Sequence, residues 1–222
     1  MNKLKLSHRL QTIVDIVPVC DLVVDVGCDH GKVLAKLFLE NKIQRAIASD
    51  ISAPSVEKAK QLLTELGYID RVNIVVGDGM QNIDQASVDV VIVAGMGGRE
   101  ILQIMDNCQA NVGTWVLQPM SDVAYVRECL HNNGYKITKD QFFYDKGKYY
   151  TLLKVETGKQ RLNQLQLKYG VEYKNDLVLK EYLGKEIVKV EKYLTQASSK
   201  IQSKDLKKKY KELKKIVRSI HE

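Results

Sequence analysis

The feature that most constrains the fold is a repeated alternation of short, nearly all-apolar runs with segments of helical periodicity. The runs have the length and composition of strands buried on both faces, and they lie at 22–26, 46–48, 72–76, 88–93 and 115–117. Apolar residues at helical spacing precede the first run, between a capping Ser7 and the helix-terminating Pro18. This alternation predicts right-handed crossovers and a parallel sheet with helices on both faces.

Two further strands are expected at 135–144 and 149–155, and they differ from the first five. Only residues 145–148 join them, and this connection is too short for a crossover helix, so we expect an antiparallel hairpin. The predicted fold class is therefore α/β: a doubly wound, mostly parallel, seven-stranded sheet with an antiparallel last strand.

The C-terminal part of the chain has a different charge and periodicity. Residues 1–157 contain 17 Lys+Arg and 19 Asp+Glu, whereas residues 158–222 contain 17 and 8. We expect two domains, 1–157 and 158–222, of which the second is helical and meets a polyanion. Two apolar seams with a polar turn between them at 202–205 favour an antiparallel helical hairpin; a dimerising coiled coil is the alternative.

Composition excludes several classes of protein. With 45% hydrophobic and 27% charged residues, the chain is neither disordered nor fibrous. It contains no apolar run of the roughly 20 residues that span a bilayer, and its N-terminus lacks the pattern of a secretory signal. Four cysteines without a Cys-x-x-Cys spacing argue against a zinc site or a disulfide framework. We expect a cytoplasmic, monomeric protein without a metal or a membrane partner.

The predicted strands end in residues suited to hold a ligand, and in a doubly wound sheet these ends share one edge. The first is followed by Asp25-Val26-Gly27-Cys28-Asp29-His30-Gly31, whose Gly-x-x-x-Gly spacing is not the dinucleotide fingerprint. Asp25 and Asp29 would repel a pyrophosphate and favour a positively charged ligand. Asp50 follows the second strand at the position of a ribose-binding acid, although it could instead cap the next helix.

The later strand ends add to this pattern. Asp78 lies between two glycines and can accept a hydrogen bond from an exocyclic amine, although a plain turn is the alternative. Residues 94–98 are too rich in glycine for an ordinary helix start, and Gln118-Pro119 follows the fifth strand.

Together these segments resemble the class I S-adenosylmethionine-dependent methyltransferases and, more specifically, the bacterial tRNA (adenine-22-N1)-methyltransferase family. The motifs that carry the resemblance are residues 24–30, 48–51, 77–79, 94–98 and 117–119. It covers about residues 7–155 and extends more weakly through residues 168–170 into the helical extension. The chain departs from the family pattern at Met120, where asparagine is common, and at Gly31-Lys32, where aromatic or small residues are frequent.

The resemblance implies S-adenosylmethionine as cofactor, tRNA as substrate and methyl transfer to N1 of an adenine. The cofactor-binding residues that it implies are Arg9, Asp25, Gly27, Cys28, Asp29, His30, Asp50, Ile51, Gly77, Asp78, Gly79, Met80, Ala94 and Gly95. The expected substrate-binding residues are Met96, Gly97, Gly98, Gln118, Pro119, Lys207, Lys208 and Lys209. Asp29 and His30 are the candidate catalytic residues, although Asp29 could serve the cofactor alone and His30 could cap a helix.

Three functions from different classes follow from these patterns. The first is a tRNA methyltransferase, whose target base must leave the stack because N1 lies on the Watson–Crick edge. The second is a methyltransferase acting on another RNA, on a small molecule or on a protein, and the basic C-terminal segment opposes the last two of these substrates. The third is a non-catalytic RNA-binding module, which the acidic loop, Asp50 and Asp78 oppose. For the lysines at 207–209, a solvated helical face is the alternative to an RNA contact.

Overall fold

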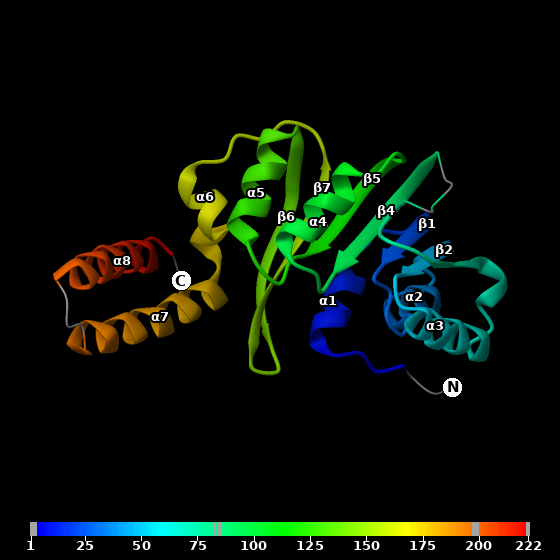
Figure 1. Ribbon diagram of the computed structural model, residues 1–222, viewed down its shortest axis with the longest axis horizontal. Helices are drawn as coiled ribbons and strands as arrows, with labels where there is room; N and C mark the ends of the chain where they lie inside the picture. The colour runs from blue at the N-terminus through cyan, green and yellow to red at the C-terminus, as the bar shows by residue number, and fades with distance from the viewer. Residues whose placement is uncertain (1–3, 82, 84–85, 197–199, 221–222) are drawn as a thin grey trace.

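The computed structural model describes residues 4–81, 83, 86–196 and 200–220. Its centre is a seven-stranded sheet with the strand order β3-β2-β1-β4-β5-β7-β6 (Figure 1). The strands are β1 (Cys20–Val26), β2 (Ile43–Asp50), β3 (Val72–Val76), β4 (Ser87–Ala94), β5 (Asn111–Gln118), β6 (Tyr135–Asp145) and β7 (Lys148–Thr157). The first five are parallel, and β7 runs antiparallel to both β5 and β6. The predicted doubly wound sheet with a reversed last strand is confirmed.

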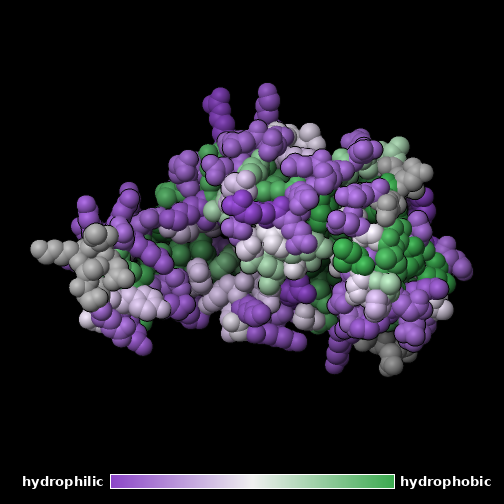
Figure 2. Space-filling model, viewed as in Figure 1, coloured by the Kyte–Doolittle hydropathy of each residue, from purple (hydrophilic) through white to green (hydrophobic). Residues whose placement is uncertain are grey.

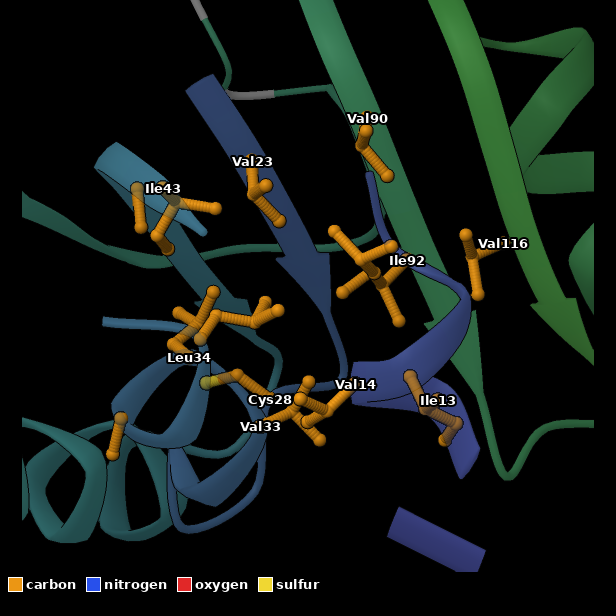
Figure 3. Close-up of a cluster of buried hydrophobic side chains, with 14 of the residues drawn as sticks. Ile13, Val14, Val23, Cys28, Val33, Leu34, Ile43, Val90, Ile92 and Val116 are labelled. Carbon is orange, nitrogen blue, oxygen red and sulfur yellow. The ribbon is translucent and has the colours of Figure 1, made fainter. Parts of the chain in front are cut away.

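Helices cover both faces of the sheet. On one face lie α1 (His8–Ile16), α2 (Lys32–Leu39) and α3 (Ala53–Glu65), and on the other lie α4 (Gly98–Asp106) and α5 (Val123–Asn132). As predicted, Ser7 caps α1, where its hydroxyl accepts a hydrogen bond from the backbone N–H of Leu10. Figure 3 shows side chains of α1 and α2 converging with those of β1 and β4. A short 3-10 turn (Ile69–Arg71) precedes β3.

The register of the parallel strands aligns their carboxyl ends at one edge of the sheet. Val26, the last residue of β1, pairs with Ser49 near the end of β2 and with Val93 near the end of β4. Ala94 at the end of β4 pairs with Gln118 at the end of β5. The loops that follow these strands therefore meet, as the sequence predicts for ligand-binding segments.

The C-terminal part is helical and has a core of its own. It consists of α6 (Gln164–Tyr169), a 3-10 turn (Tyr173–Asn175), α7 (Leu177–Gln196) and α8 (Lys200–Ser219). Leu183 and Val190 of α7 share this core with Leu213 and Ile216 of α8, so the two helices pack on each other as the predicted hairpin (Figure 1). The visible surface of this part is largely hydrophilic (Figure 2).

The turn predicted at residues 202–205 is wrong, because α8 is already helical there. Helix α7 ends at Gln196 and α8 begins at Lys200, and Ala197 of the predicted seam lies outside the described residues. The polar residues Lys204 and Asp205 are exposed on a continuous helix. A polar run does not end a helix when it contains neither glycine nor proline.

A buried ion pair joins the sheet to the C-terminal segment. The guanidinium of Arg127 on α5 donates to both carboxylate oxygens of Asp140 on β6 at 2.8 and 2.9 Å. Both side chains are almost fully buried, and one Asp140 oxygen also accepts from the backbone N–H of Val171 at 2.9 Å. Asp140 therefore connects α5, through Arg127, with the segment that leads to α7, through Val171. The division into domains at residues 157 and 158 stays a prediction.

Within the part of the chain that the structure describes, no helix combines the length and apolar character needed to cross a bilayer.

Candidate functional site

A cavity of about 400 Å³ opens at the carboxyl edge of the sheet, where the ends of β1 to β4 meet the start of α1. This volume is within the usual range for small-molecule sites. The cavity is lined by most of the residues predicted to bind a ligand: Arg9, Asp25, Gly27, Cys28, Asp29, His30, Asp50, Ile51, Gly77, Asp78, Gly79, Ala94, Gly95 and Met96. The structure thus brings together segments that are far apart in the sequence.

Asp25 at the end of β1 is the most buried acid of this cavity, with 4% of its surface exposed. Among the described residues, no group donates a hydrogen bond to its carboxylate. Burial, together with the smaller effects of the Asp50 and Asp29 charges, raises the pKa of Asp25 to about 7. A buried carboxylate without a donor is costly, and a cationic ligand would remove that cost.

Asp50 at the end of β2 holds two loops of the cavity together. One carboxylate oxygen accepts from the backbone N–H of Asp29 at 3.1 Å, and the other accepts from Ser52 at 2.9 Å. The N-cap of α3 is Ser52 and not Asp50, since the Ser52 hydroxyl accepts from Ser55. Asp50 therefore stabilises the loop before α3 while it lines the cavity.

The loop after β1 has a backbone that glycine makes possible. Gly27 adopts a φ of +74°, and a Cβ there would lie 2.4 Å from Cε of Met96. Gly31 adopts a φ of +66°, and a Cβ there would lie 2.9 Å from the Cβ of Ala59 on α3. These two positions let the loop fold tightly over the strand end and start α2 directly at the cavity.

Arg9 forms the wall of the cavity nearest to β5. Its guanidinium donates to Oε1 of Gln118 at 2.7 Å and lies 5.8 Å from the ring of Tyr150. Gln118 is fully buried and does not line the cavity. The structure therefore places Gln118 behind Arg9, where it orients the guanidinium.

Several predicted residues do not line the cavity. Met80 is buried in the core on the α4 face, and Gly97, Gly98 and Pro119 also lie outside the lining. A Cβ at Gly98 would lie 2.6 Å from the backbone oxygen of Ser121, so this glycine serves the close packing of α4 on the loop before α5.

Lys207, Lys208 and Lys209 lie on α8 and are exposed. Figure 1 shows α8 at the opposite end of the molecule from α2 and α3, which flank the cavity. Lys209 lies 3.6 Å from a carboxylate oxygen of Glu186 on α7. A contact between this cluster and RNA stays a prediction.

The sequence patterns did not identify some of the residues that line the cavity. Leu10 and Ile13 of α1 and Ile104 of α4 line the cavity, and their helical spacing marks them only as core positions. Glu100 also lines it, and its carboxylate accepts from the backbone N–H of Gly97 at 3.3 Å. The Gly-x-x-Glu spacing of a capping box was the signal that could have identified Glu100.

Comparisons with known proteins agree with this geometry. Residues 6–153 match the family described as "Methyltransferase domain". The tRNA (adenine(22)-N(1))-methyltransferase of Bacillus subtilis is 30% identical over 161 residues, which are 71% of this chain and 68% of that protein.

Solved structures from Streptococcus pneumoniae give the same result. A putative tRNA (m1A22) methyltransferase superposes with a TM-score of 0.89 at 26% identity, covering 96% of this chain and all of the other. The same protein in complex with S-adenosyl-L-methionine superposes with a TM-score of 0.83 over the same shares of both chains. The fold, the family match and the curated relative agree with the sequence motifs, and this chain belongs to the tRNA (adenine(22)-N(1))-methyltransferase family.

Proposed function

We propose that this protein transfers a methyl group from S-adenosylmethionine to N1 of adenine 22 in tRNA. The observation that carries this proposal is the buried carboxylate of Asp25, which accepts no hydrogen bond from the described residues, in an acidic cavity at the strand ends. The membership in the family provides the specific substrate. A dinucleotide or nucleoside triphosphate would bring phosphates to the same carboxylates, and these charges would repel each other.

The residues of the cavity fit the cofactor. Asp25 suits its positively charged groups, because an adjacent cation compensates a buried carboxylate. Asp50 at the end of β2 suits the ribose hydroxyls, and Asp78 after β3 suits the exocyclic amine of the adenine. Ile51, with 76% of its surface exposed beside the cavity, offers an apolar contact to a flat base.

The bound cofactor supplies an electrophilic methyl group. The adenine N1 already holds a lone pair in the plane of the ring, so no protein group has to remove a proton before attack. The protein therefore acts mainly by aligning the base and by stabilising the positive charge that the base acquires. A carboxylate at the rim of the cavity is suited to that second task.

Asp29 and His30 occupy this rim. The side chain of Asp29 is 71% exposed and that of His30 is 41% exposed, and Nε2 of His30 lies 3.5 Å from Oδ1 of Asp29. In our proposal, Asp29 faces the positive charge on the methylated base and His30 borders the entering nucleotide. Met96, which lines the cavity, borders the pocket for the base.

The C-terminal part would hold the remainder of the tRNA. We propose that residues 1–157 perform the reaction and that residues 158–222 contact phosphates, with the lysines at 207–209 among the contacts. We also propose that the enzyme works as a monomer, since α7 and α8 bury their apolar faces on each other. We further propose that it acts in the cytoplasm, because its proposed substrate is tRNA.

The test is methylation of a tRNA transcript with radiolabelled S-adenosylmethionine, followed by nuclease digestion and identification of the labelled nucleoside. We expect label in N1-methyladenosine, and we expect no label in a matched transcript with guanine at position 22. The Asp25→Ala variant serves as the control for the cavity. Label in another nucleoside, or equal label in both transcripts, would contradict the proposed target.

A further inference from the structure

The hairpin of β6 and β7 projects past the edge of the sheet at which the cavity opens. Pairing between β5 and β7 ends at Leu153, whereas β6 and β7 remain paired as far as Asp145 and Lys148. Figure 1 shows the free end of this hairpin between α1 and α7. The projecting end thus lies between the cavity and the basic C-terminal helices.

Aromatic rings cover one face of this projecting end. Phe142 stacks on Tyr149 with ring centroids 5.4 Å apart and an interplanar angle of 5°. Tyr182 of α7 packs against both rings, with centroids 5.4 and 4.9 Å away, so these three residues attach the hairpin to α7. Tyr144 extends the cluster outward: its ring centroid lies 5.0 Å from that of Tyr149, and 51% of its surface is exposed.

One lysine contacts the exposed tyrosine, and two more lie at the tip of the hairpin. Lys185 of α7 lies 5.8 Å from the Tyr144 ring and donates to the Tyr149 hydroxyl at 2.9 Å. Lys146 and Lys148 are exposed in the turn of the hairpin. These four residues, Tyr144, Lys146, Lys148 and Lys185, form what we call the hairpin platform.

Of the acidic side chains beside the platform, one pairs with a platform lysine and the other contacts α1. Glu181 pairs with Lys185 at 2.6 Å. Asp145 accepts from the backbone N–H of Arg9 at 3.1 Å, so its carboxylate faces α1. The same contact links the turn to the cavity, because Arg9 lines the cavity wall.

The backbone of the turn gives a second, independent observation. Lys146 has a φ of +47° and Gly147 a φ of +87°, as in the two-residue turns that favour Asn-Gly or Asp-Gly. Lysine is disfavoured in this left-handed conformation, whereas asparagine and glycine adopt it readily. The chain therefore places a positive charge at the tip where a different residue would give a more stable turn, as is typical of functional positions.

We propose that the hairpin platform contacts the tRNA beside the target adenine, with Tyr144 stacking on an unpaired base and the lysines contacting phosphates. Stacking on an exposed tyrosine with phosphate contacts from nearby lysines is how single-stranded nucleic acid is held without sequence preference. This inference rests on the proposed function, because it takes tRNA as the substrate.

The first test replaces Tyr144 and measures the dissociation constant of a tRNA transcript by filter binding. Tyr144→Ala should raise that constant by at least about fivefold, the lower end of what a stacked base contributes. Tyr125→Ala is the matched control, because Tyr125 is 41% exposed on α5 and lies outside both the platform and the C-terminal segment. Calorimetry with S-adenosylmethionine should give the same affinity for both variants and the wild type.

The second test separates binding from stability. Lys146→Asn should raise the melting temperature, since asparagine suits the left-handed position, and should weaken tRNA binding. The slope of log affinity against log salt should also become shallower by about 0.7–0.9 for one lost phosphate contact. Lys58→Gln is the charge-matched control, because Lys58 is an exposed residue of α3. It should change neither the melting temperature, nor the tRNA affinity, nor the salt dependence.

The outcomes distinguish this inference from the proposed function. Unchanged tRNA affinity in both Tyr144→Ala and Lys146→Asn, with a wild type that methylates tRNA, would overturn the platform and leave the proposed function intact. A wild type that neither binds nor methylates tRNA would overturn both. Loss of binding in the Tyr125 and Lys58 controls to the same extent would also overturn the platform.

Discussion

The replacement of Asp25 by asparagine should increase the stability of the free protein and weaken cofactor binding. Asp25→Asn keeps the shape of the side chain and removes the charge that burial disfavours. The pKa of Asp25 is raised from 3.8 to about 7, so the folded protein holds a proton that the unfolded chain has released between these pH values. Each pKa unit corresponds to about 1.4 kcal/mol, which gives a cost of up to about 4 kcal/mol at pH 8.

The proton on Asp25 determines whether the free energy of unfolding rises or falls with pH. Because the folded state binds more protons between pH 4 and pH 7, the free energy of unfolding of the wild type falls as the pH rises through this window. Above about pH 7 both states are deprotonated, and the contribution becomes constant. The Asp25→Asn variant lacks this contribution, so its advantage should grow from near zero at low pH to its full value at pH 8.

The assay is urea unfolding of the wild type and of Asp25→Asn at several pH values without ligand, together with calorimetric titration of S-adenosylmethionine. The wild type should bind the cofactor more tightly as the pH rises through 7, because binding displaces the proton from Asp25. The variant should bind more weakly and without this pH dependence. Equal stability at pH 8, or equal affinity at every pH, would refute the reasoning.

Three further predictions concern packing and the RNA surface. Arg127→Ala should lower the free energy of unfolding, measured by urea unfolding, by about 3–5 kcal/mol, because it leaves the carboxylate of Asp140 buried without its cation. The control is the double variant with Asp140→Leu, which should lose less stability. Gly98→Ala should destabilise the protein by about 1–3 kcal/mol. Gly184→Ala on α7, where a Cβ meets no atom within 4 Å, should stabilise it by about 0.5–1 kcal/mol. A melting temperature for Gly98→Ala equal to or above that of Gly184→Ala would contradict the packing. Replacing residues 207–209 with glutamate should raise the tRNA KM and leave cofactor affinity unchanged, and an unaltered KM would exclude that surface.

Much of the fold could be predicted because the decisive signals are local. The run at 90–93 is apolar on both faces, as expected for a strand in the interior of a parallel sheet. The four-residue connection at 145–148 excludes a crossover helix, so the reversed β7 follows from chain length alone. By contrast, the position of the turn between α7 and α8 depends on which polar residues face solvent, and the composition of 202–205 does not reveal this.

The candidate site was predictable where a strand end places a residue at the cavity, as for Asp25, Asp50 and Asp78. It was not predictable where a contact joins distant segments. The bond from Arg9 to Gln118 joins residues 109 positions apart in the sequence. Asp140 accepts a further hydrogen bond from Val171, in a segment without strand signals. Such partners are set by tertiary packing, which leaves no periodic trace in the sequence.

The most direct test is a crystal structure of this protein with S-adenosylhomocysteine. Our account predicts electron density for the ligand in the cavity at the strand ends, with its amino group against Asp25 and its nucleoside between Asp50 and Asp78. Density at another surface, or a cavity that instead holds a nicotinamide dinucleotide, would contradict it.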